Sequence, residues 1–327
     1  MYNKFKNILF MRIINFKKLM LLLGIVSLTT LNSCLDEDNY NEQNNKDYKL
    51  IEQYLAENNL EATKSPYGFY YTVIESNDTG EEVKEDDILS IFYEMKILNG
   101  AIIDEVKESS GIPKKINIVT NSIFPQGIIM GSALMKEGEK YRFYIPSNLA
   151  YGSYSYESLI PSNAVIIMET KIAKIEDEDD QKQFEKATIE TYITDNNITD
   201  INETDFGAFY KKTENGTGDS PIEGNRVKTK YVAKYLDGTE FSKTETDKTF
   251  DFTVGTESII KGVNESIKLM QKGEKATFII PSNLAYYSSL QIFPETIRED
   301  LLEKGLISQK IPPFTNLIFE IELVDIN

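Results

Sequence analysis

Hydrophobic side chains recur along the chain first at helical spacing and then at strand spacing. In residues 47–61 (DYKLIEQYLAENNLE), one helix face carries the apolar positions Leu50, Ile51, Tyr54 and Leu55. Apolar runs follow at 68–75 and 88–98, bounded by Asn, Asp and Gly, which is typical of strands and turns. The pattern predicts a helix that leads into a sheet.

The same order returns in the second half. Residues 184–197 match the first helix, and strand patterns follow at 207–212 and 227–236. Ile51 and Ile189 are 138 positions apart, as are Gly100 and Gly238 of two predicted hairpins. A repeat this long predicts two duplicated domains rather than a solenoid. We interpret the acidic segment 176–183 (EDEDDQKQ) between them as a linker.

The two copies are most alike over 135–153 (MKEGEKYRFYIPSNLAYGS) and 270–288 (MQKGEKATFIIPSNLAYYS). Each begins with a helical pattern and a Gly-Glu-Lys turn, and continues with a strand at 141–145 or 276–280. A proline then ends the strand, because proline cannot donate to a strand ladder. The loop that follows, Ser-Asn-Leu-Ala-Tyr, presents Tyr151 in one copy and Tyr286 in the other.

The composition limits the chemistry. The chain has 327 residues, 41% apolar and 27% charged, which suits a folded soluble protein of two domains. It has no histidine and one cysteine, so no catalytic triad or zinc site that needs histidine can form. We therefore expect no metal and no cofactor.

The N-terminus resembles a lipoprotein signal. Residues 1–33 hold five basic residues and no acid, then a short apolar run, which predicts a signal peptide starting at Met1 or Met11. Leu31-Asn32-Ser33-Cys34 resembles a bacterial lipobox, although Asn32 departs from it. The resemblance implies lipid on Cys34 and an anchor in the bacterial envelope, periplasmic or surface-facing; the alternative is a buried structural cysteine.

After the signal, residues 34–46 are polar and predict a flexible tether. Their acidic start, 35–38, resembles the surface-export signal of Bacteroidetes lipoproteins or is simply a solvated linker. Without residues 1–33 the net charge changes from −17 to −22, which argues against a nucleic-acid partner.

Each unit ends with Ile-Pro and an apolar strand, at 160–169 and 311–320. Together with the Gly-Glu-Lys turn, the Ala-Tyr loop and the Asn/Asp-Gly hairpin, this resembles the FK506-binding protein (FKBP) family of peptidyl-prolyl isomerases over roughly 86–175 and 227–326. The resemblance implies an α+β fold of two domains, 47–176 and 177–327. Each would be a twisted antiparallel sheet wrapped around a short helix, at 127–137 and 262–272, and preceded by its leading helix.

The resemblance also implies a pocket in each domain. In the first, the matching positions are Tyr93, Ile103, Asp104, Phe124, Ile128, Tyr151, Ile160 and Met168. In the second they are Tyr231, Phe241, Phe250, Phe252, Ile259, Ile260, Val263, Tyr286, Ile311 and Phe319. The alternative for Tyr93, Tyr231 and the phenylalanines is a role in the core alone, whereas Tyr151 and Tyr286 lie in loops where core packing does not require them.

Both units depart from the family pattern. In the first, Ile103 and Ile128 replace aromatic residues, and Pro125 removes a backbone N–H that meets the ligand. In the second, Ser242 replaces the aspartate, Val263 replaces the aromatic floor, and Tyr287 replaces a glycine. The second unit also carries an insert, 288–310, with a helical pattern at 295–305. We expect it to form a lid over its own pocket or an extra client surface.

These residues suit an isomerase that needs no nucleophile. Rotation of an X-Pro bond faces a barrier of about 20 kcal/mol. An apolar bowl that desolvates the amide, with a few donors, favours the twisted state. The leading hypothesis is an envelope prolyl isomerase or folding helper that acts on proline-containing polypeptides among exported proteins. The alternatives are a non-catalytic binding module in a surface complex and, third, a glycan-binding lipoprotein.

Overall fold

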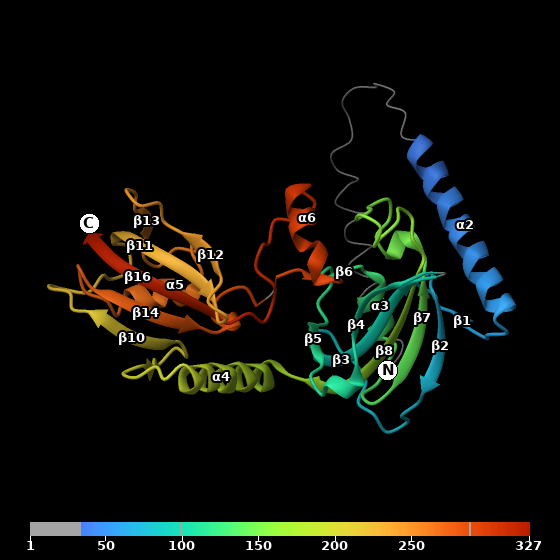
Figure 1. Cartoon of the computed structure of the whole chain (residues 1–327), viewed down its shortest axis with the longest axis horizontal. Helices are drawn as coiled ribbons and strands as arrows, with labels where there is room; N and C mark the ends of the chain where they lie inside the picture. The colour runs from blue at the N-terminus through green and yellow to red at the C-terminus, as the bar shows by residue number, and fades with distance from the viewer. Residues whose placement is uncertain (1–33, 99, 288) are drawn as a thin grey trace, which may run out of the picture. The chain divides into compact units, whose positions relative to one another are not determined.

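A computed structural model of the chain describes residues 34–98, 100–287 and 289–327. The predicted signal peptide lies outside the described residues. The predicted α+β fold is confirmed: two antiparallel sheets each pack against a short helix (Figure 1). The first part of the chain contains α2 (Cys34–Glu57), β1 (Thr63–Lys64), β2 (Tyr70–Glu75), β3 (Ile88–Ile97), β4 (Ile102–Val106), β5 (Lys114–Asn117), β6 (Ile123–Phe124), α3 (Gly127–Ser132), β7 (Lys140–Ile145) and β8 (Ile166–Glu176).

The second part repeats this order and adds the insert. It contains α4 (Glu178–Asp195), β9 (Asn202–Glu203), β10 (Phe209–Glu214), β11 (Arg226–Tyr235), β12 (Glu240–Lys243), β13 (Phe250–Thr253), α5 (Lys261–Ile267), β14 (Lys275–Ile280), β15 (Gln291–Ile292), α6 (Arg298–Glu303) and β16 (Leu317–Ile326). Single 3₁₀ turns lie at Glu108–Ser110, Ser147–Leu149, Ser282–Leu284 and Glu295–Ile297.

The two sheets have the same topology. The first runs β1-β2-β7-β8-β3-β4, with β5 also paired to β3, and the second runs β9-β10-β14-β16-β11-β12, with β13 also paired to β11. The final strand of each unit is therefore central in its sheet. The duplication predicted from the spacing of the sequence patterns extends to every strand of the sheet.

Each sheet is apolar on both faces. Successive side chains of a strand point to opposite sides, and apolar residues occupy both sets of positions. On β7, Phe143 packs in the core around α3, whereas Tyr144 packs against the leading helix α2. On β14, Phe278 and Ile279 divide in the same way between α5 and α4. The leading helices therefore cover the second face of each sheet.

The helix α2 corrects the prediction of a flexible tether at 34–46, since these residues are helical and continue without a break to Glu57. Ile51 and Leu55 hold the C-terminal half of the helix against Tyr70 and Tyr144.

The short helices end earlier than the sequence predicted, after six residues in α3 and seven in α5. They sit very close to the sheet through a glycine. A Cβ atom at Gly127 would lie 2.5 Å from Cγ2 of Ile145, so no larger residue fits unless the helix or the Ile145 side chain shifts.

The predicted linker 176–183 is mostly helix, which is a second correction. Strand β8 ends at Glu176, and α4 begins at Glu178. Asp177 caps α4 by accepting a hydrogen bond from the backbone N–H of Asp180, whose side chain bonds back in a capping box. The acidic residues thus form the first turn of a helix rather than an extended linker.

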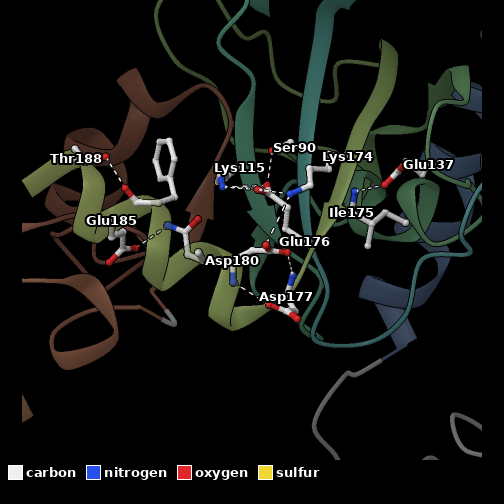
Figure 2. A network of polar contacts seen from close by, with 12 residues as sticks. Ser90, Lys115, Glu137, Lys174, Ile175, Glu176, Asp177, Asp180, Glu185 and Thr188 are labelled. Carbon is white, nitrogen blue, oxygen red and sulfur yellow. Dashed lines mark hydrogen bonds and ion pairs between the residues drawn. The ribbon is translucent and has the colours of Figure 1, made fainter. Parts of the chain in front are cut away.

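Glu176 is the centre of a polar network at this junction (Figure 2). Its carboxylate accepts a hydrogen bond from Ser90 Oγ at 2.6 Å and lies 2.9 Å from Lys115 Nζ. Burial raises the pKa of Glu176, but the hydrogen bonds from Ser90 and Lys115 and the Lys115 charge outweigh burial, so the pKa lies below its ordinary value. The ionised form therefore stabilises the folded chain.

We expect the Glu176→Gln variant to lower the free energy of unfolding by about 1 kcal/mol at pH 7. Because the folded pKa is depressed, the contribution of Glu176 is present above the unfolded pKa, near 4.5, and is lost as the pH falls through the folded value. Urea denaturation of the native chain and the variant between pH 7 and pH 3 measures this: the two curves should converge at low pH. The exposed Glu85 supplies the control Glu85→Gln, and a constant gap at all pH values would contradict the assignment.

Candidate functional site

The first-domain bowl brings together the residues predicted for it. Ile103, Ile128, Tyr151, Ile160 and Met168 are buried in one hydrophobic cluster with Tyr93, and Phe124 packs against it. Asp104 lies at the edge, where it accepts a hydrogen bond from Tyr93 Oη at 2.6 Å. Tyr151 comes from the Ala-Tyr loop, and it is 4% exposed rather than free of the core.

This bowl is already occupied by the insert of the second domain. Ile292, Phe293, Ile297 and Leu301 belong to the same cluster, and the first three are fully buried. The ring of Phe293 lies 5.2 Å from that of Tyr93 in an edge-to-face arrangement. The expectation that the insert covers its own pocket is therefore wrong: its apolar residues pack into the other unit. Its predicted helix is also shorter, a 3₁₀ turn followed by α6.

Burial in the closed bowl shifts the pKa values of its tyrosine and lysine side chains. Burial, followed by the charge and hydrogen bond of Asp104, raises the pKa of Tyr93, and burial raises the pKa of Tyr151 well above its ordinary value. Burial also lowers the pKa of Lys114, whose Nζ lies 4.1 Å from the centre of the Phe293 ring. Both tyrosines are therefore neutral donors at physiological pH.

The second-domain bowl is an open cavity of about 390 Å³. Most of the predicted positions line it: Tyr231, Phe241, Phe250, Ile259, Ile260, Val263, Tyr286 and Phe319. Phe252 and Ile311 lie in the hydrophobic core instead, and they are not part of the cavity wall. The wall also includes Thr229, Ala233, Ser242, Glu257, Ser258 and Ile321. Of these, Thr229 and Ala233 follow from strand alternation around Tyr231, a signal that the sequence contained.

Polar groups in this cavity are few. Tyr231 Oη and Ser242 Oγ share a hydrogen bond of 2.9 Å, where the first domain has the Tyr93–Asp104 pair. Burial raises the pKa of Tyr286, which is half-buried, and its hydroxyl bonds to no other described residue. Tyr286 therefore offers a neutral donor to a ligand in an aromatic cavity.

A buried carboxylate positions each tyrosine loop, and the sequence prediction missed it. Asp47 of α2 accepts hydrogen bonds from Ser147 N at 2.8 Å and Ser147 Oγ at 2.6 Å. Glu185 of α4 does the same for Ser282, also at 2.8 and 2.6 Å. Asp47 and Glu185 are 138 positions apart, the same spacing as Ile51 and Ile189, so the repeat carried the signal. The leading helices thus fix the loops that present Tyr151 and Tyr286.

The described residues contain no group of three Cys, Asp or Glu side chains arranged to hold a metal ion. None of the described helices is both long enough and apolar enough to cross a membrane.

Comparison with known proteins agrees with this architecture. The profile of the family described as FKBP-type peptidyl-prolyl cis-trans isomerase matches residues 79–173 and 218–324, one segment in each sheet. The chain belongs to this family. The predicted resemblance is thereby confirmed, and we refer to the two units as FKBP domains.

Individual relatives match parts of the chain. The FKBP-type isomerase FkpA of Aeromonas hydrophila is 33% identical over 131 residues, 39% of this chain and 46% of that protein. The FKBP-type 22 kDa isomerase of Escherichia coli K12 is 32% identical over 127 residues, 38% of this chain and 53% of that protein. Bovine FKBP10 is 23% identical over 244 residues, 74% and 35% of the two chains. The chain thus spans about half the length, or less, of these relatives.

Among solved structures, FkpA from Escherichia coli is 24% identical and covers 46% of this chain, with 62% of its own chain matched and a TM-score of 0.35.

The two FKBP domains differ most in what fills the bowl. In the first, Phe293 lies between the side chains that would meet a ligand. In the second, the described residues leave the corresponding space open as a cavity, which is bordered by four aromatic rings and Tyr286. The duplicated scaffold therefore offers one closed bowl and one open bowl.

Proposed function

We propose that the chain is a peptidyl-prolyl cis-trans isomerase whose working site is the cavity of the second FKBP domain. The observation that carries the proposal is the open aromatic bowl of about 390 Å³ with the hydroxyl of Tyr286 at its wall. A cavity of this size and lining accepts a proline ring and its neighbouring side chain. The substrates are proline-containing polypeptides, and in an envelope protein these would be exported chains.

The mechanism rests on desolvation and one or two hydrogen bonds. In the planar ground state, resonance places negative charge on the carbonyl oxygen of the X-Pro bond, and water stabilises that charge. Transfer into the bowl of Phe241, Phe250 and Phe319 removes the water and weakens the resonance. Tyr286 Oη and the backbone N–H of Ile260 are then available to orient the peptide in its twisted state.

The test is the isomerisation rate of a Leu-Pro tetrapeptide, measured by NMR exchange with the full chain. We expect acceleration over the uncatalysed rate and a loss of about 10-fold in kcat/KM for Tyr286→Phe, because one hydrogen bond of about 1.4 kcal/mol is removed. The matched control Tyr67→Phe removes a hydroxyl from an exposed ring outside both bowls and should leave the rate unchanged. A rate equal to that of buffer alone would refute the enzymatic proposal.

The second candidate function is binding without turnover. Ser242 favours it, because a hydroxyl replaces the acid that pairs with the corresponding tyrosine in the first domain. In that case Tyr286→Phe would weaken the binding of a proline peptide while no variant altered a rate. The same NMR experiment separates the two, because binding shifts peptide signals and turnover exchanges them.

We also propose an envelope location through lipid on Cys34. The support is the lipobox-like sequence before Cys34 and the basic and apolar stretch that precedes it. Cells that express the chain and take up an alkyne-labelled fatty acid should label it, and Cys34→Ala should abolish the label. Equal labelling of both forms would exclude Cys34 as the acceptor.

A further inference from the structure

We propose that the bowl of the first FKBP domain is a receptor for the chain's own insert and is closed to clients in the folded protein. The ligand class is an extended Ile-Phe-Pro segment, here Ile292 to Pro294. The evidence that the first bowl is closed consists of contacts between the insert and the bowl. The consequence that clients bind to the second domain rests on the proposed function.

Phe293 is the anchor of this interaction. Its side chain is fully buried between the Tyr93 ring and Lys114 Nζ, at 5.2 and 4.1 Å from the ring centre. Large side chains buried in desolvated pockets are typical anchors of protein interfaces, and a cation near the face of an aromatic ring adds a further attraction. Lys114 Nζ also donates to the Ile292 carbonyl at 3.4 Å.

The insert also binds as a strand. β15 pairs in parallel with β6, and the backbone N–H groups of Gln291 and Phe293 donate to the carbonyls of Ser122 and Phe124 at 2.7 and 2.9 Å. The Gln291 side chain is buried and forms two bonds with the backbone of Asn117, accepting from its N–H at 2.8 Å and donating to its carbonyl at 2.9 Å. A buried amide with matched partners fixes the register, because a shift of the strand would leave these groups unpaired.

The hydroxyl of Tyr151 in the bowl forms a hydrogen bond with the peptide group that precedes Pro294. Tyr151 Oη donates to the carbonyl oxygen of Phe293 at 2.5 Å, and this oxygen belongs to the amide that joins Phe293 to Pro294. Pro294 is buried as well. The insert thus uses the same kind of group that an X-Pro client would present, and both cannot occupy the bowl together.

The rest of the insert holds this segment in place. Arg298 is buried and donates to the carbonyls of Leu290 at 2.6 Å and Gln309 at 2.9 Å, which ties the two ends of the insert together. Ile297 and Leu301, four residues apart, present one helical face to the cluster. Tyr154 Oη donates to Asp300 at 2.7 Å at the edge. A tethered segment has an effective concentration on the order of millimolar, so a free client at micromolar concentration competes poorly.

The test uses a fluorescein-labelled peptide with the sequence of residues 290–305 (LQIFPETIREDLLEKG) and fluorescence anisotropy with the full chain. Every chain in the test carries Phe241→Ala and Tyr286→Phe, which impair the second-domain cavity, so that binding reports on the first bowl. With a native insert, the chain should not bind the peptide at micromolar concentrations, because the first bowl is filled. The variant Gln291→Ala/Phe293→Ala, which disengages the insert, should bind at least about 10-fold more tightly. In that background, Tyr151→Phe should weaken binding about 5- to 10-fold through loss of its hydrogen bond.

A peptide with alanine in place of its phenylalanine is the matched control and should not bind the opened variant. Equal affinity of native and opened chains would overturn the proposal, as would an opened chain that is folded by circular dichroism but binds no peptide. Light scattering reports the source of the occupant: a native monomer agrees with a ligand from the same chain, whereas a dimer that dissociates on opening would overturn it. None of these measurements depends on turnover, so an inactive isomerase would leave the result intact.

Discussion

The Phe241→Ala variant is expected to reduce the kcat/KM of prolyl isomerisation by about 30- to 100-fold, equivalent to about 2–3 kcal/mol. Phe241 lines the second-domain cavity, where its ring lies 5.0 Å from Tyr235 and 6.3 Å from Phe319. It is half-buried on the short strand β12, so its loss opens the wall to water without removing the centre of the core. Phe241→Ala should therefore reduce the desolvation of the substrate amide, and with it the rate, more than it reduces the stability of the fold.

The comparison variant for Phe241→Ala is Phe184→Ala, which removes an exposed ring on α4 that is 55% accessible. It should leave the rate within a factor of about two, as expected for a surface substitution. The isomerisation rate is measured by NMR exchange at equal concentrations of folded protein. A Phe241→Ala chain with unchanged kcat/KM would place the working site elsewhere.

The Phe293→Ala variant should have the largest effect on stability. The Phe293 side chain is fully buried and contacts Tyr93 and Lys114, so its removal leaves a cavity in the first domain. Burial at this level predicts a loss of about 3–5 kcal/mol in the free energy of unfolding. Amide hydrogen exchange should locate the loss in the insert and in the strands that surround the bowl.

Leu306→Ala is the matched control for Phe293→Ala, because Leu306 lies in the same insert but is 59% exposed. It should cost less than about 0.5 kcal/mol. If Phe293→Ala were equally mild, the insert would not be part of the core of the first domain.

Much of the fold could be predicted from the sequence, because short sequence patterns that occur in both repeats specify its strands and turns. Strand alternation, the hairpin glycines and the prolines that end β7 and β14 each determine a local structure. The leading helices were also predictable from Ile51 and Ile189. Their exact starts were not, because the acidic residues at 34–46 and 176–183 are compatible with solvated linkers and with helix N-termini alike.

The second bowl was largely predictable, since its aromatic residues come from the strands that the repeat defines. The closure of the first bowl was not. It depends on Phe293, which lies 142 positions from Tyr151 in the sequence. The insert occurs in the second unit alone, so the repeat gives no information about which part of the chain it contacts. The apolar run Leu290 to Phe293 was visible in the insert, but only the structure assigns its partner.

One bowl of this protein is open and the other is closed. The most direct measurement is a titration of the full chain, labelled at isoleucine methyl groups, with a Leu-Pro tetrapeptide followed by NMR. We expect the signals of Ile259 and Ile260, which line the second cavity, to shift with saturation at one peptide per chain. Ile103, Ile128 and Ile160, packed with Phe293 in the first bowl, should not shift. Binding of two peptides per chain, with shifts at Ile103 and Ile128, would contradict the claim.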